Sequence, residues 1–192
     1  MGHSQLEKQK THDRIVEIAS RRLRERGLDG VGVADLMKEA GLTVGGFYKH
    51  FASRDDMVAE AMKLAFGSWE AKVRSQGRAP ADIPMAEYSA NYLSEVHRDD
   101  VSGGCPFAAL TADLARSDEK CRSLATEQLK TNLGNMTGRM NAVDEADARR
   151  KAIIVSCLMT GAVGLARIAD DEKLSEEILE TVRSFVDGFS AK

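Results

Sequence analysis

The run from residue 43 to residue 54 brings together side chains that bind phosphate. It contains Thr43, Tyr48, Lys49, His50 and Arg54, whose hydroxyl, ammonium, imidazole and guanidinium groups all donate hydrogen bonds to phosphate oxygens. Such contacts hold a protein on a nucleic acid without specifying its sequence. The run therefore predicts a surface that binds the phosphate backbone. His50 has one alternative, a core histidine satisfied by backbone groups.

A short helix behind a tight turn must position these groups. Gly41 supplies the left-handed residue that ends a helix over about residues 33–40. Thr43 is expected to cap a second helix, about Val44 to His50. Phe47 is the residue of this second helix that should face the core. Two short helices joined in this way are typical of a helix-turn-helix.

The outer face of the second helix is smooth. Gly45 and Gly46 let the backbone come close to a groove, and Val44 offers an apolar contact of the kind a thymine methyl group accepts. A short helix with such a face and a basic end suits the DNA major groove. The sequence thus predicts that this helix reads DNA.

The motif resembles the signature of the TetR family of bacterial repressors. The resemblance rests on residues 41–51, read GLTVGGFYKHF, followed by SRDDM at residues 53–57, and it extends from about Thr11 to Ala61. One departure is Gly32, where the family usually has Thr or Ser as a helix cap. The resemblance implies a phosphate contact at Arg14, because the start of the first helix lies beside DNA in the family. It also implies a homodimer that binds a palindromic operator and a small effector.

The rest of the chain has helical periodicity, and no segment alternates at period two for long enough to form a strand. We expect an all-α fold of about nine helices, divided into a DNA-binding head at 1–54 and a body at 55–192 that binds the effector and dimerises. The first nine residues should form a mobile arm. Beyond the head, helices are expected from about 53 to 73, from 85 to 99, from 106, from 118 to 140, from 145 to 168 and from 175 to 189.

The last two helices carry more apolar surface than one neighbour can cover. Gly161 and Gly164 lie inside the first of them, where glycine costs about 1 kcal/mol relative to alanine. Close helix packing or room for a ligand would offset that cost. In the family these helices form a four-helix bundle with a partner; the alternative is a core within one chain. The predicted dimer residues are Ile154, Leu158, Gly161, Ile178, Val182, Phe185 and Phe189.

Aromatic and soft apolar side chains of the body supply candidates for the effector pocket. Each residue taken alone is more typical of a core, and we expect fewer than half of them to touch a ligand. The candidates are Phe66, Trp69, Tyr88, Tyr92, Cys105, Phe107, Leu110, Met159 and Val163.

Cys105 precedes Pro106 at the predicted start of a helix, and a helix N-terminus favours a thiolate. The resemblance permits a sensor role, since some TetR-like repressors respond to electrophiles through one cysteine; the alternative is a small buried residue. Cys121 and Cys157 are expected to be buried. An enzyme with Cys105 as nucleophile and His97 as base is the other class considered, but no third group to orient the base is evident.

Charge is distributed unevenly along the chain. The net charge is −3, yet residues 1–54 carry 10 Lys and Arg against 7 Asp and Glu. The excess of positive charge therefore lies where DNA would be met. The odd number of cysteines favours reduced thiols and a cytoplasmic protein. No membrane segment, metal site or cofactor is predicted.

Overall fold

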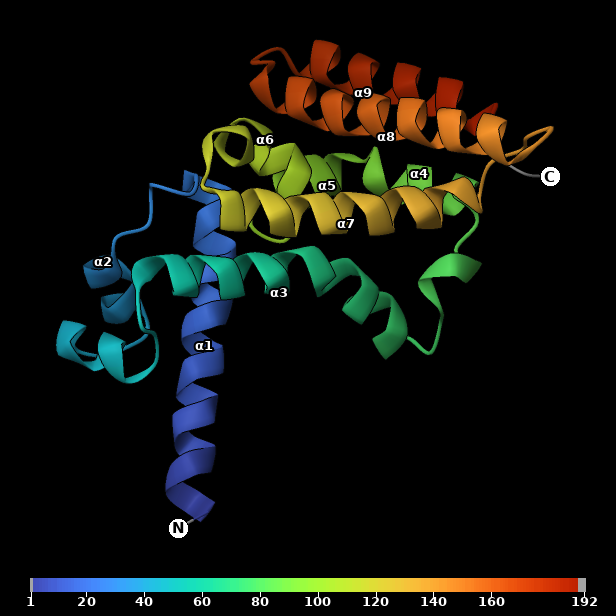
Figure 1. The fold of residues 1–192 in the computed structure, drawn as a ribbon. Helices are drawn as coiled ribbons and strands as arrows, with labels where there is room; N and C mark the ends of the chain where they lie inside the picture. Colours follow the sequence, from blue (N-terminus) through green and yellow to red (C-terminus); the bar gives the residue numbers. More distant parts are fainter. Residues whose placement is uncertain (1, 190–192) are drawn as a thin grey trace.

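The computed structural model describes residues 2–189, which contain nine α-helices, two short 3-10 helices and no β-strand. This agrees with the predicted all-α fold. Figure 1 shows a head built around one end of the chain and a layered helical body. The elements are α1 (Gly2–Arg26), α2 (Val33–Glu39), η1 (Val44–Lys49), α3 (Arg54–Ser75), η2 (Pro80–Asp82), α4 (Met85–Tyr92), α5 (Glu95–Asp99), α6 (Pro106–Arg116), α7 (Glu119–Thr137), α8 (Glu145–Ile168) and α9 (Glu172–Asp187).

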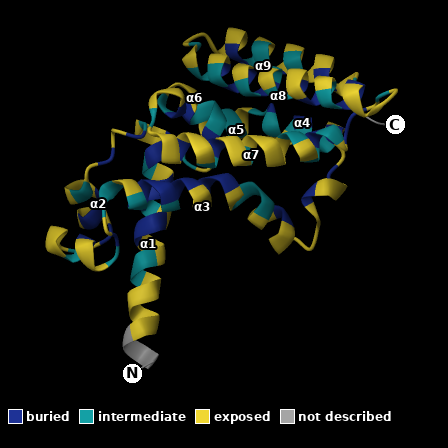
Figure 2. Cartoon of the chain, viewed as in Figure 1, coloured by how far each residue is buried: buried dark blue, intermediate teal, exposed yellow. Residues whose placement is uncertain are grey.

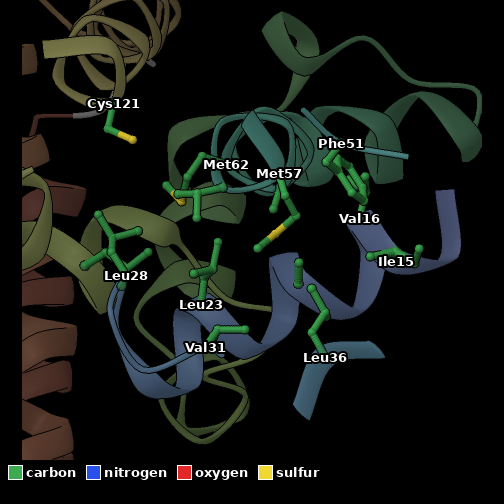
Figure 3. Close-up of a cluster of buried hydrophobic side chains, with 14 of the residues drawn as sticks. Ile15, Val16, Leu23, Leu28, Val31, Leu36, Phe51, Met57, Met62 and Cys121 are labelled. Atoms are coloured by element: carbon green, nitrogen blue, oxygen red, sulfur yellow. The ribbon is translucent and has the colours of Figure 1, made fainter. Parts of the chain in front are cut away.

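The head consists of α1, α2 and η1 packed on the first half of α3. Gly27 and Gly41 have φ angles of 81° and 68°, so both end their helices in the left-handed conformation that glycine adopts without strain. Figure 3 shows Met57 and Met62 of α3 facing Leu23 of α1 within this core. The shared core fixes the start of α3 against the helix-turn-helix.

The first helix begins much earlier than expected. We predicted a mobile arm over the first nine residues, but α1 is helical from Gly2, and only residue 1 of that arm lies outside the described residues. Lys10 pairs with Glu7 at 3.3 Å, and Gln9 donates to Asp13 at 2.7 Å. Pairs at these spacings support a helix that has no apolar face of its own, which is why apolar periodicity missed it.

The segment predicted as one helix from 85 to 99 is two helices. The chain turns at Leu93, which is buried. Ser94 then caps α5, its hydroxyl accepting a hydrogen bond from the His97 amide at 3.2 Å. A serine cap inside an apparently continuous pattern thus starts a new helix.

The helices α8 and α9 form the outer layer of the body (Figure 1). Asp144 and Asp171 cap them, so α9 begins at Glu172 rather than at Ser175. Buried apolar side chains of α8 and α9 make a second core with α4 and α7. By length and composition α8 could span a membrane, but the core helix of a soluble protein passes the same test, and α8 packs along α7 and α9.

Two polar contacts tie the head to the body. Arg24 of α1 is buried and donates to the carbonyl oxygen of Gly104, just before α6, at 3.2 Å. Lys120 of α7 pairs with Asp56 of α3 at 2.5 Å. The body therefore contacts the head at both α1 and α3.

Candidate nucleic-acid interface

The short helix η1 is held by its aromatic side. Phe47 is fully buried, with its ring 5.2 Å from that of Phe51 and 5.3 Å from that of Tyr48. Tyr48 itself is 74% exposed. Thr43 has the extended backbone of a helix cap, but its side chain makes no capping hydrogen bond, which corrects the expected role. The Thr43 hydroxyl therefore stays available to an outside acceptor.

Most of the predicted DNA residues in and beside η1 are exposed, whereas Gly46 is half-buried. Thr43, Val44, Gly45, Tyr48 and Lys49 are exposed. A methyl group added at Gly45 would meet no atom within 4 Å. The turn thus presents a smooth surface with a hydroxyl, a phenol and an ammonium group around it, which suits close approach to a DNA groove.

His50 lies at the inner edge of this surface. Its side chain is half-buried, and its Nδ1 atom is buried with no hydrogen-bond partner among the described residues. Burial lowers the pKa of His50, and the nearby positive groups of His12, Lys8 and Lys49 lower it further. His50 is therefore not a core histidine whose ring is hydrogen-bonded by backbone groups. An anion placed beside the ring would favour its protonated form.

The two arginines predicted at DNA differ in their surroundings. Arg14 is exposed on α1. Arg54 is partly buried, and its guanidinium group donates to the carbonyl oxygens of Leu28 and Val31, the latter at 3.2 Å. Arg54 therefore braces the connection between α1 and α2, and its predicted phosphate contact would compete with these bonds.

The predicted pocket residues do not form a single group. Phe66, Phe107 and Leu110 pack with the core of the head, with the Phe66 and Phe107 rings stacked at 5.0 Å. Met159 and Val163 belong to the second core. A row of aromatic rings in van der Waals reach of one another runs along the body, and Tyr88 and Tyr92 of this row pack against the second core. It consists of Trp69, Tyr88, Tyr92 and His97, with successive centroids 5.2, 5.9 and 4.5 Å apart.

Cys105 stands at the end of this row, at the cap position of α6. Its amide donates to Nε2 of His97 at 2.9 Å, and the carbonyl oxygen of Tyr92 lies 2.6 Å from Nδ1 of the same ring. The ring therefore carries its proton on Nδ1 and uses Nε2 to accept from an amide. This arrangement leaves neither nitrogen free to take the proton of the thiol. Burial lowers the pKa of His97.

The other two cysteines differ from each other. Cys121 is buried as predicted, and burial raises the pKa of its thiol to about 11. Cys157, predicted to be buried, is exposed. It lies on the outer side of α8, one of the two helices whose apolar surface is expected to exceed what one neighbour can cover. The described residues hold no group of three side chains that could bind a metal ion.

Figure 2 shows exposed residues along the outer side of α8 and α9, and several of these exposed residues are large and apolar. Ile154 of α8 is 43% exposed and Phe185 of α9 is 56% exposed. Gly161 has nothing within 4 Å of the position of an added methyl group. The remaining predicted dimer residues, all half-buried, are Leu158, Ile178, Val182 and Phe189.

One part of the interface was not predicted from the sequence. The first turns of α1 extend beside η1, and Lys8 and Thr11 line a hollow there together with Lys49 and His50. The spacing of Lys8, His12 and Ile15 would have indicated this, because it continues the inner face of α1 by helical steps.

Two family models match the chain. Residues 15–61 match a family model described as bacterial regulatory proteins, tetR family. Residues 84–182, about half of the chain, match one described as transcriptional regulator LmrA/YxaF-like, C-terminal domain.

Individual proteins resemble the chain in part or over most of its length. The HTH-type transcriptional regulator PksA of Bacillus subtilis is 37% identical over 60 residues, which are 31% of this chain and 29% of that protein. An uncharacterized HTH-type transcriptional regulator of Mycobacterium tuberculosis is 22% identical over 83% of this chain and 85% of its own length.

Solved structures share the fold. A transcriptional regulator of the TetR family from Cytophaga hutchinsonii has a TM-score of 0.77 at 20% identity, covering 97% of this chain and 98% of that one. The reduced form of NemR from E. coli has a TM-score of 0.73 at 18% identity, covering 95% and 97%.

Proposed function

Because this chain belongs to the TetR family of bacterial regulatory proteins, and so is a helix-turn-helix transcriptional regulator, we propose that it is a cytoplasmic repressor released from a palindromic operator by a small effector. The main observation in support of this proposal is the exposed surface of η1. It combines an open backbone at Gly45 with phosphate donors at Tyr48 and Lys49. In this proposal residues 1–54 bind DNA, and residues 55–192 bind the effector and dimerise.

A homodimer fits the surface of the body. A monomer would expose the apolar side of α8 and α9 to water, which is energetically unfavourable. Exposed apolar patches of this kind mark interfaces. A two-fold dimer through this face repeats each contact twice and carries two copies of η1. Two such helices read half-sites about 34–36 Å apart on one face of the duplex.

The proposal is tested by selecting fragments of the source genome that the protein binds. We expect recovered fragments to share a near-palindromic sequence and the protein to bind each as a dimer. The genes beside them would indicate the class of effector. Tight binding of a monomer to a single half-site would contradict the proposal.

The aromatic row from Trp69 to His97 supports an effector site in the body. Tyr88 and Tyr92 of this row pack against the core of α8 and α9, and Trp69 lies on α3, which shares the core of the head. A ligand inserted at the row would therefore change the packing between α3 and α4. To act, the ligand must bind the DNA-free arrangement of the dimer more tightly than the DNA-bound one. Its apolar lining favours an apolar or electrophilic molecule.

Cys105 is the candidate for an electrophile-sensing residue within this site. With a quinone, the thiol sulfur would bond to a ring carbon conjugated with a carbonyl group, and the carbonyl oxygen would take the thiol proton. The hydrogen of the attacked carbon would then move to the second carbonyl oxygen, which leaves a hydroquinone thioether. We expect this to weaken operator binding by at least about tenfold, or about 1.4 kcal/mol, because the adduct must displace packed neighbours next to Gly104, which Arg24 ties to the head. The measurement is operator affinity during a quinone titration, for wild type and Cys105→Ser.

The serine variant should stay bound at quinone concentrations that release wild type. Release of both proteins at the same concentration, or of neither, would show that Cys105 does not sense electrophiles. The alternative of a thiol enzyme is disfavoured by the ring of His97, whose two nitrogens already bond to Cys105 and Tyr92 backbone groups.

A further inference from the structure

Arg139 follows α7 and lies at the end of the body away from the head (Figure 1). It is only 6% exposed. Its guanidinium group donates to the carbonyl oxygens of Ile83 at 2.9 Å, of Asn135 at 2.7 Å, and of Pro80. These bonds use three of the five N–H donors of an arginine. Two N–H groups of Arg139 therefore have no acceptor among the described residues.

The charge of Arg139 has no carboxylate beside it. Within the described part of the chain, the acidic side chains of the flanking helices pair elsewhere. Glu70 of α3 pairs with Arg74 at 3.0 Å, and Glu87 of α4 pairs with Arg78 at 2.6 Å. Burial lowers the pKa of Arg139, because its positive charge is removed from water. A buried charge without an ion-pair partner is costly, so an anion from outside the chain would stabilise this side chain.

Tyr88 and Trp69 extend from the guanidinium group as two contacting rings. The Cζ atom of Arg139 lies 5.1 Å from the centre of the Tyr88 ring, and the Trp69 ring meets the Tyr88 ring at 83° with centroids 5.2 Å apart. Both aromatic side chains are half-buried. Among the described residues, neither the indole nitrogen of Trp69 nor the hydroxyl of Tyr88 forms a hydrogen bond, and neither atom is fully buried. This end of the aromatic row thus places aromatic surface and two hydrogen-bond donors next to a buried positive charge.

We propose that this site binds an aromatic carboxylate, with the carboxylate on Arg139 and the aromatic ring against Tyr88 and Trp69. The inference rests on the proposed function, since the bound acid would be the effector of the repressor. Trp69 belongs to α3, and the first half of α3 packs in the core of the head. A ligand bound against Trp69 therefore contacts the helix that connects the body to the head.

The chemistry of the site favours a carboxylate over other anions. The planar fork of a guanidinium group matches the two oxygens of a carboxylate, and two N–H groups of Arg139 remain for them. One positive charge neutralises one carboxylate, whereas a phosphate group would bring close to two negative charges into a buried site. An aromatic ligand suits the rest of the site, because rings pair in the offset-stacked and edge-to-face contacts that Tyr88 and Trp69 offer.

The test compares three aromatic acids with their uncharged amides on the full-length protein. The pairs are benzoate and benzamide, phenylacetate and phenylacetamide, and 2-naphthoate and 2-naphthamide. Isothermal titration calorimetry measures affinity, and fluorescence reports the place of binding because Trp69 is the one tryptophan of the chain. Hydrogen bonds between charged groups are stronger than neutral ones. We expect at least one acid to bind about ten- to hundredfold more tightly than its amide and to change Trp69 emission.

Three substitutions separate the charge of Arg139 from its contacts with the chain. Arg139→Met removes the charge, and the acid should then bind no more tightly than its amide. Arg139→Lys keeps a positive charge as a point charge and should retain a preference for the acid of at least about threefold. Arg122→Met is the control, because Arg122 is an exposed arginine on α7. It removes the same charge outside the site and should keep the wild-type preference.

The outcomes separate this inference from the proposed function. Equal affinity for acids and amides in wild type, or the wild-type preference in Arg139→Met, would overturn the site. Loss of acid and amide binding alike in both Arg139 variants would also overturn it, because Arg139 would then only hold the segment at Pro80 in place.

If no acid binds at about 1 mM while Gly45→Glu abolishes operator binding, the site is overturned and the DNA-binding function remains. An acid that binds at Arg139 without changing operator affinity would confirm the site and contradict its role as the effector site.

Discussion

Substituting Gly45 by glutamate should abolish specific DNA binding while the protein remains folded. An added side chain at Gly45 meets no atom within 4 Å, so the head can accept it. On DNA, the same carboxylate would lie between η1 and the phosphates, where like charges at close range cost several kcal/mol. We expect operator affinity to fall at least about a hundredfold, or about 2.7 kcal/mol. Fluorescence anisotropy with a labelled operator measures it.

Gly67→Glu is the matched control. Gly67 lies on α3, and an added side chain there also meets nothing within 4 Å. It introduces the same glutamate into open space outside η1, so affinity should stay within about threefold of wild type. Thermal unfolding of both variants checks the fold. Wild-type affinity in Gly45→Glu would show that η1 does not enter the groove.

The head could be predicted from the sequence because local signals agree there. Gly41 requires a turn, Phe47 requires burial, and Ser53 caps the helix that carries Met57. Each signal depends on neighbours a few residues away, so a single sequence contains it. The position of η1 and its exposed residues followed from these signals.

Features that depend on distant contacts were not predictable in this way. Arg54 is basic and sits in a DNA-binding motif, but carbonyl oxygens of Leu28 and Val31 occupy its guanidinium group. Most of the candidate pocket residues divide between two cores, and they come from the four helices α3, α4, α6 and α8. The spacing of residues in the sequence predicts neither of these two features.

The exposure of Cys157 also depends on contacts that are distant in the sequence. Its helix α8 is apolar on nearly every side, which predicted burial of Cys157 by more than one neighbour. Within one chain, α7 and α9 pack on α8, and Cys157 remains exposed on its outer side. The apolar composition of α8 thus indicated that its surface should be buried. It did not indicate whether helices of the same chain bury that surface.

Replacing Phe185 by glutamate should convert the proposed dimer into monomers. Phe185 is 56% exposed on α9. Burying the rest of one phenylalanine contributes about 1–2 kcal/mol, and two-fold symmetry doubles this term. The two glutamates would also bring buried like charges into the interface. We expect the dimer dissociation constant to rise at least about a hundredfold, as measured by sedimentation equilibrium.

Val143→Glu is the control for this prediction, because Val143 is 90% exposed just before α8 and outside the proposed interface. Cys157 supplies a second measurement, since a thiol that is exposed in one chain should be covered in the dimer. Its alkylation, followed by mass spectrometry, should be slow in wild type and in Val143→Glu and fast in Phe185→Glu. Fast alkylation in wild type, with Phe185→Glu still sedimenting as a dimer, would place the interface elsewhere than on α8 and α9.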